Sequence, residues 1–232
     1  MRTIDSVDGI RITKTSTASL LAKVLWITTA GFLLTAFGAW IAPPSLGFGL
    51  MLVVLVNFGL IFAISAAARR SNALGLTLFY IYTVLMGVQI SPILNSYMHT
   101  AYGSQIVFEA ALTTALGMAV MAMIAQVVNF NYVRVQSYLV AALFGLIIIG
   151  LIGSFVHFLS PGLYAWATLA IFSVLLLVDF MRLRDADRSG LGASTGTAVW
   201  LALSIYLDAI NIFIALLQIF GNGGGRRDSR WS

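Results

Sequence analysis

Two carboxylates lie within the last two long apolar stretches of this 232-residue chain. Asp208 stands in the middle of the final stretch, among Leu, Ile, Ala and Phe residues, and Asp179 stands near the end of the stretch before it. An ionised carboxylate near the centre of a bilayer costs roughly 2.5–3.5 kcal/mol on insertion scales. Such a residue persists where it has a partner, a water-filled cavity or a function. The pair is therefore the candidate functional site.

Two carboxyl groups in a site of low dielectric cannot both ionise easily, so they tend to share a proton. Loss of that proton introduces repulsion that can separate two helices, which makes Asp179 and Asp208 a candidate pH sensor and gate. The same oxygens suit a hard cation such as Ca²⁺, so the two are also candidate Ca²⁺ ligands. Two simpler interpretations stay open: Asp208 can hydrogen-bond neighbouring helices, and Asp179 can form a local ion pair with Arg182.

The composition shows what positions these acids. The chain is 60% hydrophobic and 9% charged, whereas soluble domains carry about 25% charged residues. Runs of about 20 apolar residues predict an all-α membrane protein with seven transmembrane helices. We expect one membrane domain, 19–221, between a cytoplasmic tail, 1–18, and a short basic tail, 222–232. The predicted helices span residues 20–42, 46–68, 73–95, 104–128, 136–159, 163–181 and 197–220.

Basic residues alternate between the predicted loops. The N-terminal tail and the second, fourth and sixth loops carry Lys or Arg, and the first, third and fifth carry none. This alternation predicts a cytoplasmic N-terminus. The C-terminal tail breaks the pattern with Arg226, Arg227 and Arg230. The last segment therefore either spans the membrane or dips in and returns, and its length favours spanning.

The last helix carries a polar stripe within a sector of roughly 80° at the helical period, so we expect this helix to be central to the bundle. Ser204 and Asn211 in this stripe are candidate pathway residues. Glu109, near the outer end of the fourth helix, is a third candidate, although an interfacial carboxylate that reaches for the headgroups would look the same. The stripe consists of Thr197, Ser204, Asp208, Asn211 and Gln218.

Ideal helices leave the two acids at different depths. Asp208 lies about 16 Å past the predicted start of its helix, and Asp179 about 5–8 Å from the predicted end of its own. An axial offset near 10 Å results. Direct contact therefore requires the last helix to start late, with part of residues 194–203 held near the cytoplasmic surface. Otherwise the acids communicate through water.

Three segments of the chain resemble the transmembrane Bax inhibitor motif family. They are residues 72–83 with Gly87 and 90–93 of the third helix, Val178 with Asp179, and residues 203–213 around Asp208. The resemblance covers about residues 20–221, and its most specific part is the last-helix motif. Val178 departs from the pattern, because members often carry Tyr before the acid.

The resemblance implies a seven-helix bundle wrapped around the last helix and a pH-sensitive Ca²⁺ leak governed by an aspartyl pair. Carried onto this chain, the pair is Asp179 and Asp208, and Arg69 best matches the arginine that latches it. Bacterial members are multi-pass proteins of the inner (plasma) membrane, and some are linked to regulation of a membrane-bound protease. The expected partners are therefore the bilayer, Ca²⁺, protons and, in one alternative, a membrane protease.

Other functions are weighed against the leak. A regulatory protein that binds a membrane protease needs no pore, and a cation/proton exchanger would use the same acids. An intramembrane aspartyl protease would also use two acids on consecutive helices. Such proteases resemble one another in a Gly-x-Gly-Asp motif, whereas Tyr206 and Leu207 precede Asp208 here, so this function is disfavoured. We expect that the protein is not an enzyme and has neither catalytic residues nor a cofactor. We expect Ca²⁺ to be the permeant or regulatory ion. We expect no nucleic-acid partner, because the basic residues serve topology.

Overall fold

The computed structural model describes residues 19–43, 47–156, 160–189 and 194–224. These residues form an all-α fold of seven helices, each long and apolar enough to cross a membrane, as the sequence predicts. The helices are α1 (Leu20–Ile41), α2 (Phe48–Arg70), α3 (Asn72–Met98), α4 (Gly103–Val127), α5 (Tyr132–Val156), α6 (Pro161–Ser189) and α7 (Thr195–Gly224).

The sixth helix ends much later than predicted. It continues to Ser189, rather than to residue 181, through a segment rich in charge. Leu183 and Arg184 on this segment are buried, and Arg184 Nη1 donates to the carbonyl of Ala125 at 2.5 Å and to that of Val128 at 2.9 Å. Because these carbonyls end α4 and lack partners within their own helix, the arginine caps α4 and holds the extension of α6 in place.

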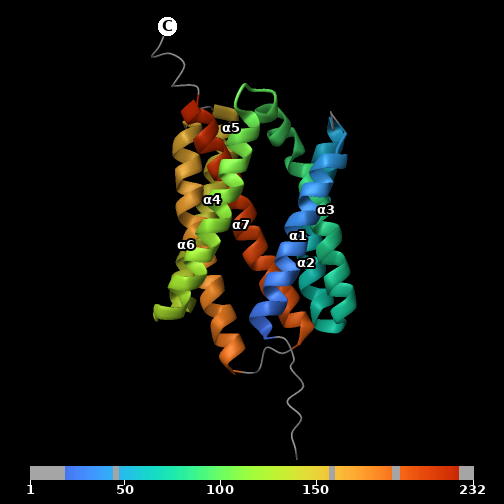
Figure 1. The fold of residues 1–232 in the computed structure, drawn as a ribbon, viewed down its shortest axis with the longest axis vertical. Helices are drawn as coiled ribbons and strands as arrows, with labels where there is room; N and C mark the ends of the chain where they lie inside the picture. The colour runs from blue at the N-terminus through green and yellow to red at the C-terminus, as the bar shows by residue number, and fades with distance from the viewer. Residues whose placement is uncertain (1–18, 44–46, 157–159, 190–193, 225–232) are drawn as a thin grey trace, which may run out of the picture.

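The last helix lies at the centre of the bundle, as predicted. Figure 1 shows α7 crossing between α1, α2 and α3 on one side and α4, α5 and α6 on the other. In its spanning window 67% of the residues are buried, against 39% or less in the other helices. Contacts with α1, α2, α3, α4 and α6 account for this burial. A side chain on α7 is therefore shielded from lipid on most faces.

Small residues bring α1, α3 and α7 close together. A Cβ atom added to Gly87 of α3 would lie 2.0 Å from the carbonyl oxygen of Thr35, and one added to Gly38 of α1 would lie 2.1 Å from that of Val84. The Thr35 hydroxyl lies 2.6 Å from the Tyr206 hydroxyl of α7 and 3.0 Å from the Thr83 carbonyl oxygen. Close backbone approach and hydroxyl hydrogen bonds are typical of helix packing in membranes, so these three helices form one tightly joined unit.

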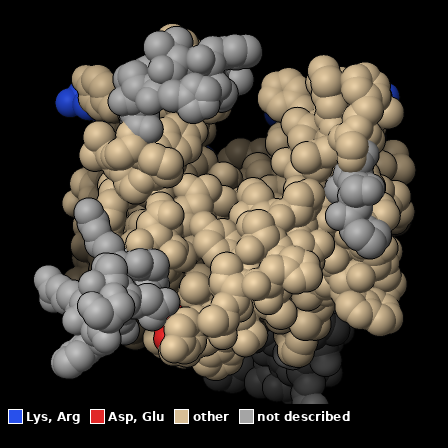
Figure 2. All heavy atoms as spheres, turned by 90° about the horizontal axis from the view of Figure 1, so that it is seen from above, with Lys and Arg blue, Asp and Glu red and all other residues tan. Residues whose placement is uncertain are grey.

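One end of the bundle carries every Lys and Arg among the described residues. We call it the basic end: α1, α3, α5 and α7 begin there, and α2, α4 and α6 end there. The opposite end, viewed in Figure 2, shows an almost uncharged surface outside the grey atoms. Because α7 is one continuous helix, it spans the bundle and does not return. The basic residues are Lys23, Arg69, Arg70, Arg134, Arg182, Arg184 and Arg188.

Candidate functional site

The structure brings the two predicted acids together. Asp179 of α6 and Asp208 of α7 are 4% and 6% exposed, and each carboxyl group is close enough to affect the ionisation of the other. Ser204, one turn before Asp208 on α7, donates its hydroxyl proton to Oδ2 of Asp179. The carboxyl pair and one serine therefore form a polar contact between α6 and α7.

The late start of the last helix that direct contact seemed to require is wrong, because α7 begins at Thr195. The extension of α6 reduces the offset instead. Asp179 lies ten residues (179 to 189) from the end of α6, or about 15 Å, and Asp208 lies thirteen residues (195 to 208) from the start of α7, or about 20 Å. The remaining offset of about 5 Å is close to one helical turn, and Ser204 covers that turn.

Arg182 supplies the positive charge of the site. Its Nη1 lies 3.3 Å from Oδ1 of Asp179, so the local ion pair left open above is present alongside the contact with Asp208. Its Nη2 donates to Oε1 of Gln136 on α5, and its guanidinium carbon lies 5.6 Å from the ring centroid of Trp200 on α7. Arg182 therefore joins α5, α6 and α7 at the carboxyl pair.

Arg69 lies elsewhere on the surface of the molecule. It is exposed at the end of α2 and lines a separate depression of about 410 Å³ with Phe62, Ser65, Ala66 and Arg70. Within the described part of the chain, the ion pair of Asp179 is formed by Arg182 rather than by Arg69. The latch role of Arg69 stays a prediction.

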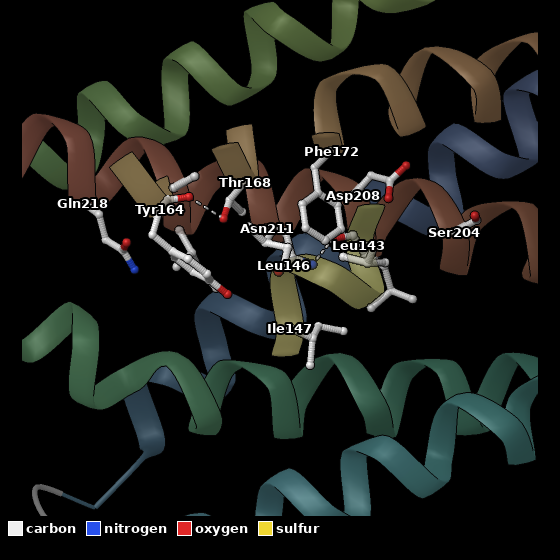
Figure 3. A pocket seen from close by; sticks show the side chains of 13 residues that line it. Leu143, Leu146, Ile147, Tyr164, Thr168, Phe172, Ser204, Asp208, Asn211 and Gln218 are labelled. Carbon is white, nitrogen blue, oxygen red and sulfur yellow. Dashed lines mark hydrogen bonds between the residues drawn. The ribbon is translucent and has the colours of Figure 1, made fainter. Parts of the chain in front are cut away.

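A cavity of about 390 Å³ adjoins the pair between α5, α6 and α7. Its α7 wall consists mainly of the polar stripe: Figure 3 shows Ser204, Asp208, Asn211 and Gln218 in succession along the helix. Asn211 Nδ2 donates to the carbonyl of Leu207 at 2.7 Å. The opposite walls are Tyr164, Thr168 and Phe172 of α6 and Leu143, Leu146 and Ile147 of α5. Both pathway candidates on α7 thus lie beside Asp208.

The carboxyl pair lies at the inner limit of this cavity. From Ser204 to Gln218 the lining covers fourteen residues of α7, or about 21 Å, in the direction away from the basic end. On the other side of Ser204, Leu201, Ala202 and Leu203 are 2%, 0% and 3% exposed and take no part in the lining. The α6–α7 interface is therefore hollow on one side of the pair and closed on the side toward the basic end.

One oxygen of the pair is unsatisfied. Asp208 Oδ2 is buried and has no hydrogen-bond partner among the described residues. Burial of an unpaired acceptor is unfavourable, and more so when the group is charged. The carboxyl group of Asp208 therefore offers an acceptor to a proton, a cation or another donor that reaches the cavity it lines.

Glu109 does not join the site. It is exposed on α4, where Gln105 Nε2 donates to its Oε1 at 2.8 Å within the same helix, and it is outside the lining of the cavity. This position fits the alternative of an interfacial carboxylate. Thr197, the first member of the stripe, lies near the start of α7 with its hydroxyl 2.9 Å from that of Ser194.

The pair offers few ligands for a resident metal ion. The described residues contain no group of three or more His, Asp or Glu side chains that could hold a metal ion. Ca²⁺ takes six to eight oxygen ligands, so two carboxyls would leave most of its shell to water.

The sequence did not reveal the partners of Arg182. Gln136 and Trp200 lie on other helices, and neither stands out in its own segment. The link between Ser204 and Asp179 had a signal, since Ser204 precedes Asp208 by four residues and shares its helix face. Tyr206 reads as part of an apolar run, and its hydrogen bond to Thr35 has no sequence signature.

Comparisons with known proteins agree with this architecture. A family model described as "Inhibitor of apoptosis-promoting Bax1" matches residues 17–225. An uncharacterised membrane protein of Streptococcus pyogenes serotype M1 is 32% identical over 183 residues, which cover 77% of this chain and 75% of the relative. Inner membrane protein YbhL of Escherichia coli K12 is 26% identical over 234 residues, which cover 93% and 96%. The chain therefore belongs to the Bax inhibitor-1 family of membrane proteins.

Proposed function

We propose that this protein is a pH-sensitive cation leak of the membrane that passes Ca²⁺, with Asp179 and Asp208 as its sensor and gate. The observation that carries the proposal is the position of the acid pair. It lies where a cavity with a polar wall meets closely packed, apolar helix surface. A change in charge at this point acts directly on the closed segment of α7, residues 201–203, which packs on the side toward the basic end.

The charge balance of the site gives the direction of the pH effect. When the pair holds a proton, one negative charge faces the guanidinium of Arg182, and the site is close to neutral. When that proton is lost, two carboxylates face one guanidinium, and their repulsion and demand for water favour separation of α6 from α7. The leak should therefore increase as pH rises through the titration of the pair.

The lining of the cavity favours cations. Asp208 is the only residue with a formal charge among those that line it. The hydroxyl of Ser204 and the amide of Asn211 add oxygen atoms, which are the ligands that Ca²⁺ prefers. A low-dielectric cavity with one carboxylate raises the local concentration of cations and lowers that of anions.

The positive-inside rule places the basic end in the cytoplasm. The cavity then extends from the pair toward the outer surface, and the closed segment between Ser204 and the basic end separates the pair from the cytoplasm. The related Escherichia coli protein is named an inner membrane protein. We propose the same membrane for this chain, with the N-terminus in the cytoplasm.

The test is Ca²⁺ efflux from liposomes that contain the purified protein, measured at a series of pH values. The double variant Asp179→Asn, Asp208→Asn should lose the pH-dependent part of the efflux, while Glu109→Gln, which removes an exposed carboxyl outside the cavity, should keep it. Unchanged efflux in the double variant would overturn the proposal. Proton counter-flow driven by a Ca²⁺ gradient would indicate an exchanger. Co-purification of a protease without ion flux would favour the regulatory alternative.

A further inference from the structure

We propose that the cavity beside Asp208 is a binding site for amphipathic primary amines, with the ammonium group at the Asp208 carboxyl group and the hydrocarbon chain along the wall of α5 and α6. The inference shares Asp208 with the proposed function but requires no ion flux. It rests on the volume, the chemistry and the orphaned acceptor of this cavity.

The volume and shape suit an elongated ligand. At about 390 Å³ the cavity lies within the range of roughly 300–1,000 Å³ that small-molecule sites occupy. It follows α7 for about 21 Å between Ser204 and Gln218. Most of the polar groups lie along the α7 wall, as Figure 3 shows for Ser204, Asp208 and Asn211, while Tyr164 and Thr168 of α6 add two hydroxyl groups.

The apolar side chains that face the polar groups offer no ligand atoms to an inorganic cation. They are Leu143, Leu146 and Ile147 of α5 and Phe172 of α6, and Leu207, Ile214 and Ala215 add apolar surface from α7. A bare or hydrated ion gains nothing from these side chains. An alkyl chain gains roughly 25 cal/mol for each Å² of apolar surface removed from water, so this wall favours a ligand with a hydrocarbon body.

The cavity offers acceptors, and three of its donors are already used within the protein. The Ser204 hydroxyl proton goes to Asp179, the Asn211 amide donates to Leu207, and the Thr168 hydroxyl donates to Tyr164 at 2.8 Å. The Asp208 carboxyl group lines the cavity and keeps one buried oxygen without a partner in the described structure, so it is the strongest acceptor left. A ligand that satisfies Asp208 must bring donors, and a primary ammonium brings three, together with a charge that matches the ionised form of the pair.

No arginine or lysine lines the cavity to compete for this carboxyl group. Arg182 is bound to Oδ1 of Asp179 and to Gln136, on the far side of the carboxyl pair from the apolar wall. Fatty alcohols would donate only one uncharged hydrogen bond, and alkyl sulfates would meet a carboxylate with a like charge. The chemistry therefore selects an amine over alcohols and anions with the same chain.

The experiment uses the full-length protein in liposomes and an alkylamine that carries a photoactivatable diazirine in its chain. Decylamine, decanol and decyl sulfate compete for labelling, and the labelled peptides are identified by mass spectrometry. We expect labels on α5, α6 and α7 segments of the cavity that decylamine removes and the other two compounds leave. Labelling of the exposed face of α2 reports simple partition into the lipid and should respond to all three compounds alike.

Two variants and one control decide the outcome. Asp208→Asn should raise the decylamine concentration needed for half displacement by about tenfold or more, the factor that follows from loss of one hydrogen bond to a charged group. Ile147→Trp fills the cavity from a partly exposed position, at 46% exposure, and should abolish the labelling while leaving the carboxyl intact. Glu109→Gln should behave as the wild type.

Equal displacement by decanol, or cavity labelling that survives both Asp208→Asn and Ile147→Trp, would overturn the inference. Labelling that depends on Asp208 in a protein without Ca²⁺ flux would remove the proposed leak but keep the amine site. Ca²⁺ flux that depends on Asp208 without specific labelling of the cavity would keep the proposed leak and remove the amine site. The two proposals can therefore fail separately.

Discussion

Ser204 on α7 donates a hydrogen bond to Oδ2 of Asp179 on α6, so one hydroxyl group joins the central helix to its neighbour one turn from Asp208. Arg182 holds the other oxygen of the same carboxyl group. Asp179 is thus satisfied on both sides, whereas Asp208 keeps a buried oxygen without a partner. The two acids of the pair consequently have different roles: Asp179 stabilises the contact between α6 and α7, and Asp208 lines the cavity.

Replacement of Ser204 by Ala tests the stabilising role of the contact with Asp179. The variant leaves Asp179 Oδ2 without its donor, which should lower the free energy of unfolding by about 1–3 kcal/mol and raise Ca²⁺ efflux at pH values where the wild type leaks little. Thermal unfolding in detergent and efflux from liposomes measure the two effects. Ser204→Thr should restore both, and Ser137→Ala, at an exposed position on α5, should change neither. Wild-type behaviour of Ser204→Ala would contradict that role.

Replacement of Arg182 by Gln removes the positive charge that balances Asp179. Ionisation of the pair then creates two carboxylates without a counter-charge, so loss of the shared proton becomes harder. We expect the rise in Ca²⁺ efflux to begin at a higher pH than in the wild type. Arg188→Gln, an exposed position on the same helix end, is the matched control. An identical pH profile for Arg182→Gln and the wild type would exclude Arg182 from the sensor.

Much of this fold was predictable, because apolar runs, loop charges and two acids within membrane helices are local signals. The end of α6 was not. Residues 182–189 contain four charged side chains in the first six positions, which hydropathy alone assigns to a loop. Their helical state depends on burial of Leu183 and on the contact of Arg184 with α4. Contacts of that kind come from another helix and leave no trace in the segment itself.

Replacement of Tyr206 by Phe tests the attachment of α7 to α1. The hydroxyl of Tyr206 lies 2.6 Å from that of Thr35, and Thr35 can still donate to the carbonyl of Gly31 or Thr83. The free energy of unfolding should therefore fall by the contribution of one neutral hydrogen bond, about 0.5–1.5 kcal/mol. Thermal unfolding measures it, and the pH profile of efflux should not move.

Tyr82→Phe is the control for that substitution. Tyr82 is equally buried, but within the described part of the chain its hydroxyl donates to a weak sulfur acceptor, Met86 Sδ, at 4.0 Å. A loss of stability at Tyr206 no larger than that at Tyr82 would mean that the contact with Thr35 contributes little. A shifted pH profile in Tyr206→Phe would instead place α1 within the moving part of the gate.

Replacement of Gly87 by Ala tests the close packing of α1 and α3. The new Cβ would lie 2.0 Å from the Thr35 carbonyl oxygen, a backbone atom that can move only with its helix. We expect a loss of about 1–3 kcal/mol, typical of overpacking, seen as a lower unfolding temperature. Gly59→Ala on α2, where nothing lies within 4 Å of the new atom, should be neutral or stabilising. Equal stability of the two variants would contradict the tight α1–α3 contact.

The central claim is that a proton held between Asp179 and Asp208 keeps the path for Ca²⁺ closed. The most direct measurement is the pH profile of Ca²⁺ efflux from matched liposomes that contain the wild type, Asp208→Asn or Glu109→Gln. Asn copies the protonated acid in shape and cannot ionise, so Asp208→Asn should give low efflux at every pH, while the other two should show efflux that rises with pH. A pH-dependent rise of the wild-type size in Asp208→Asn would contradict the claim.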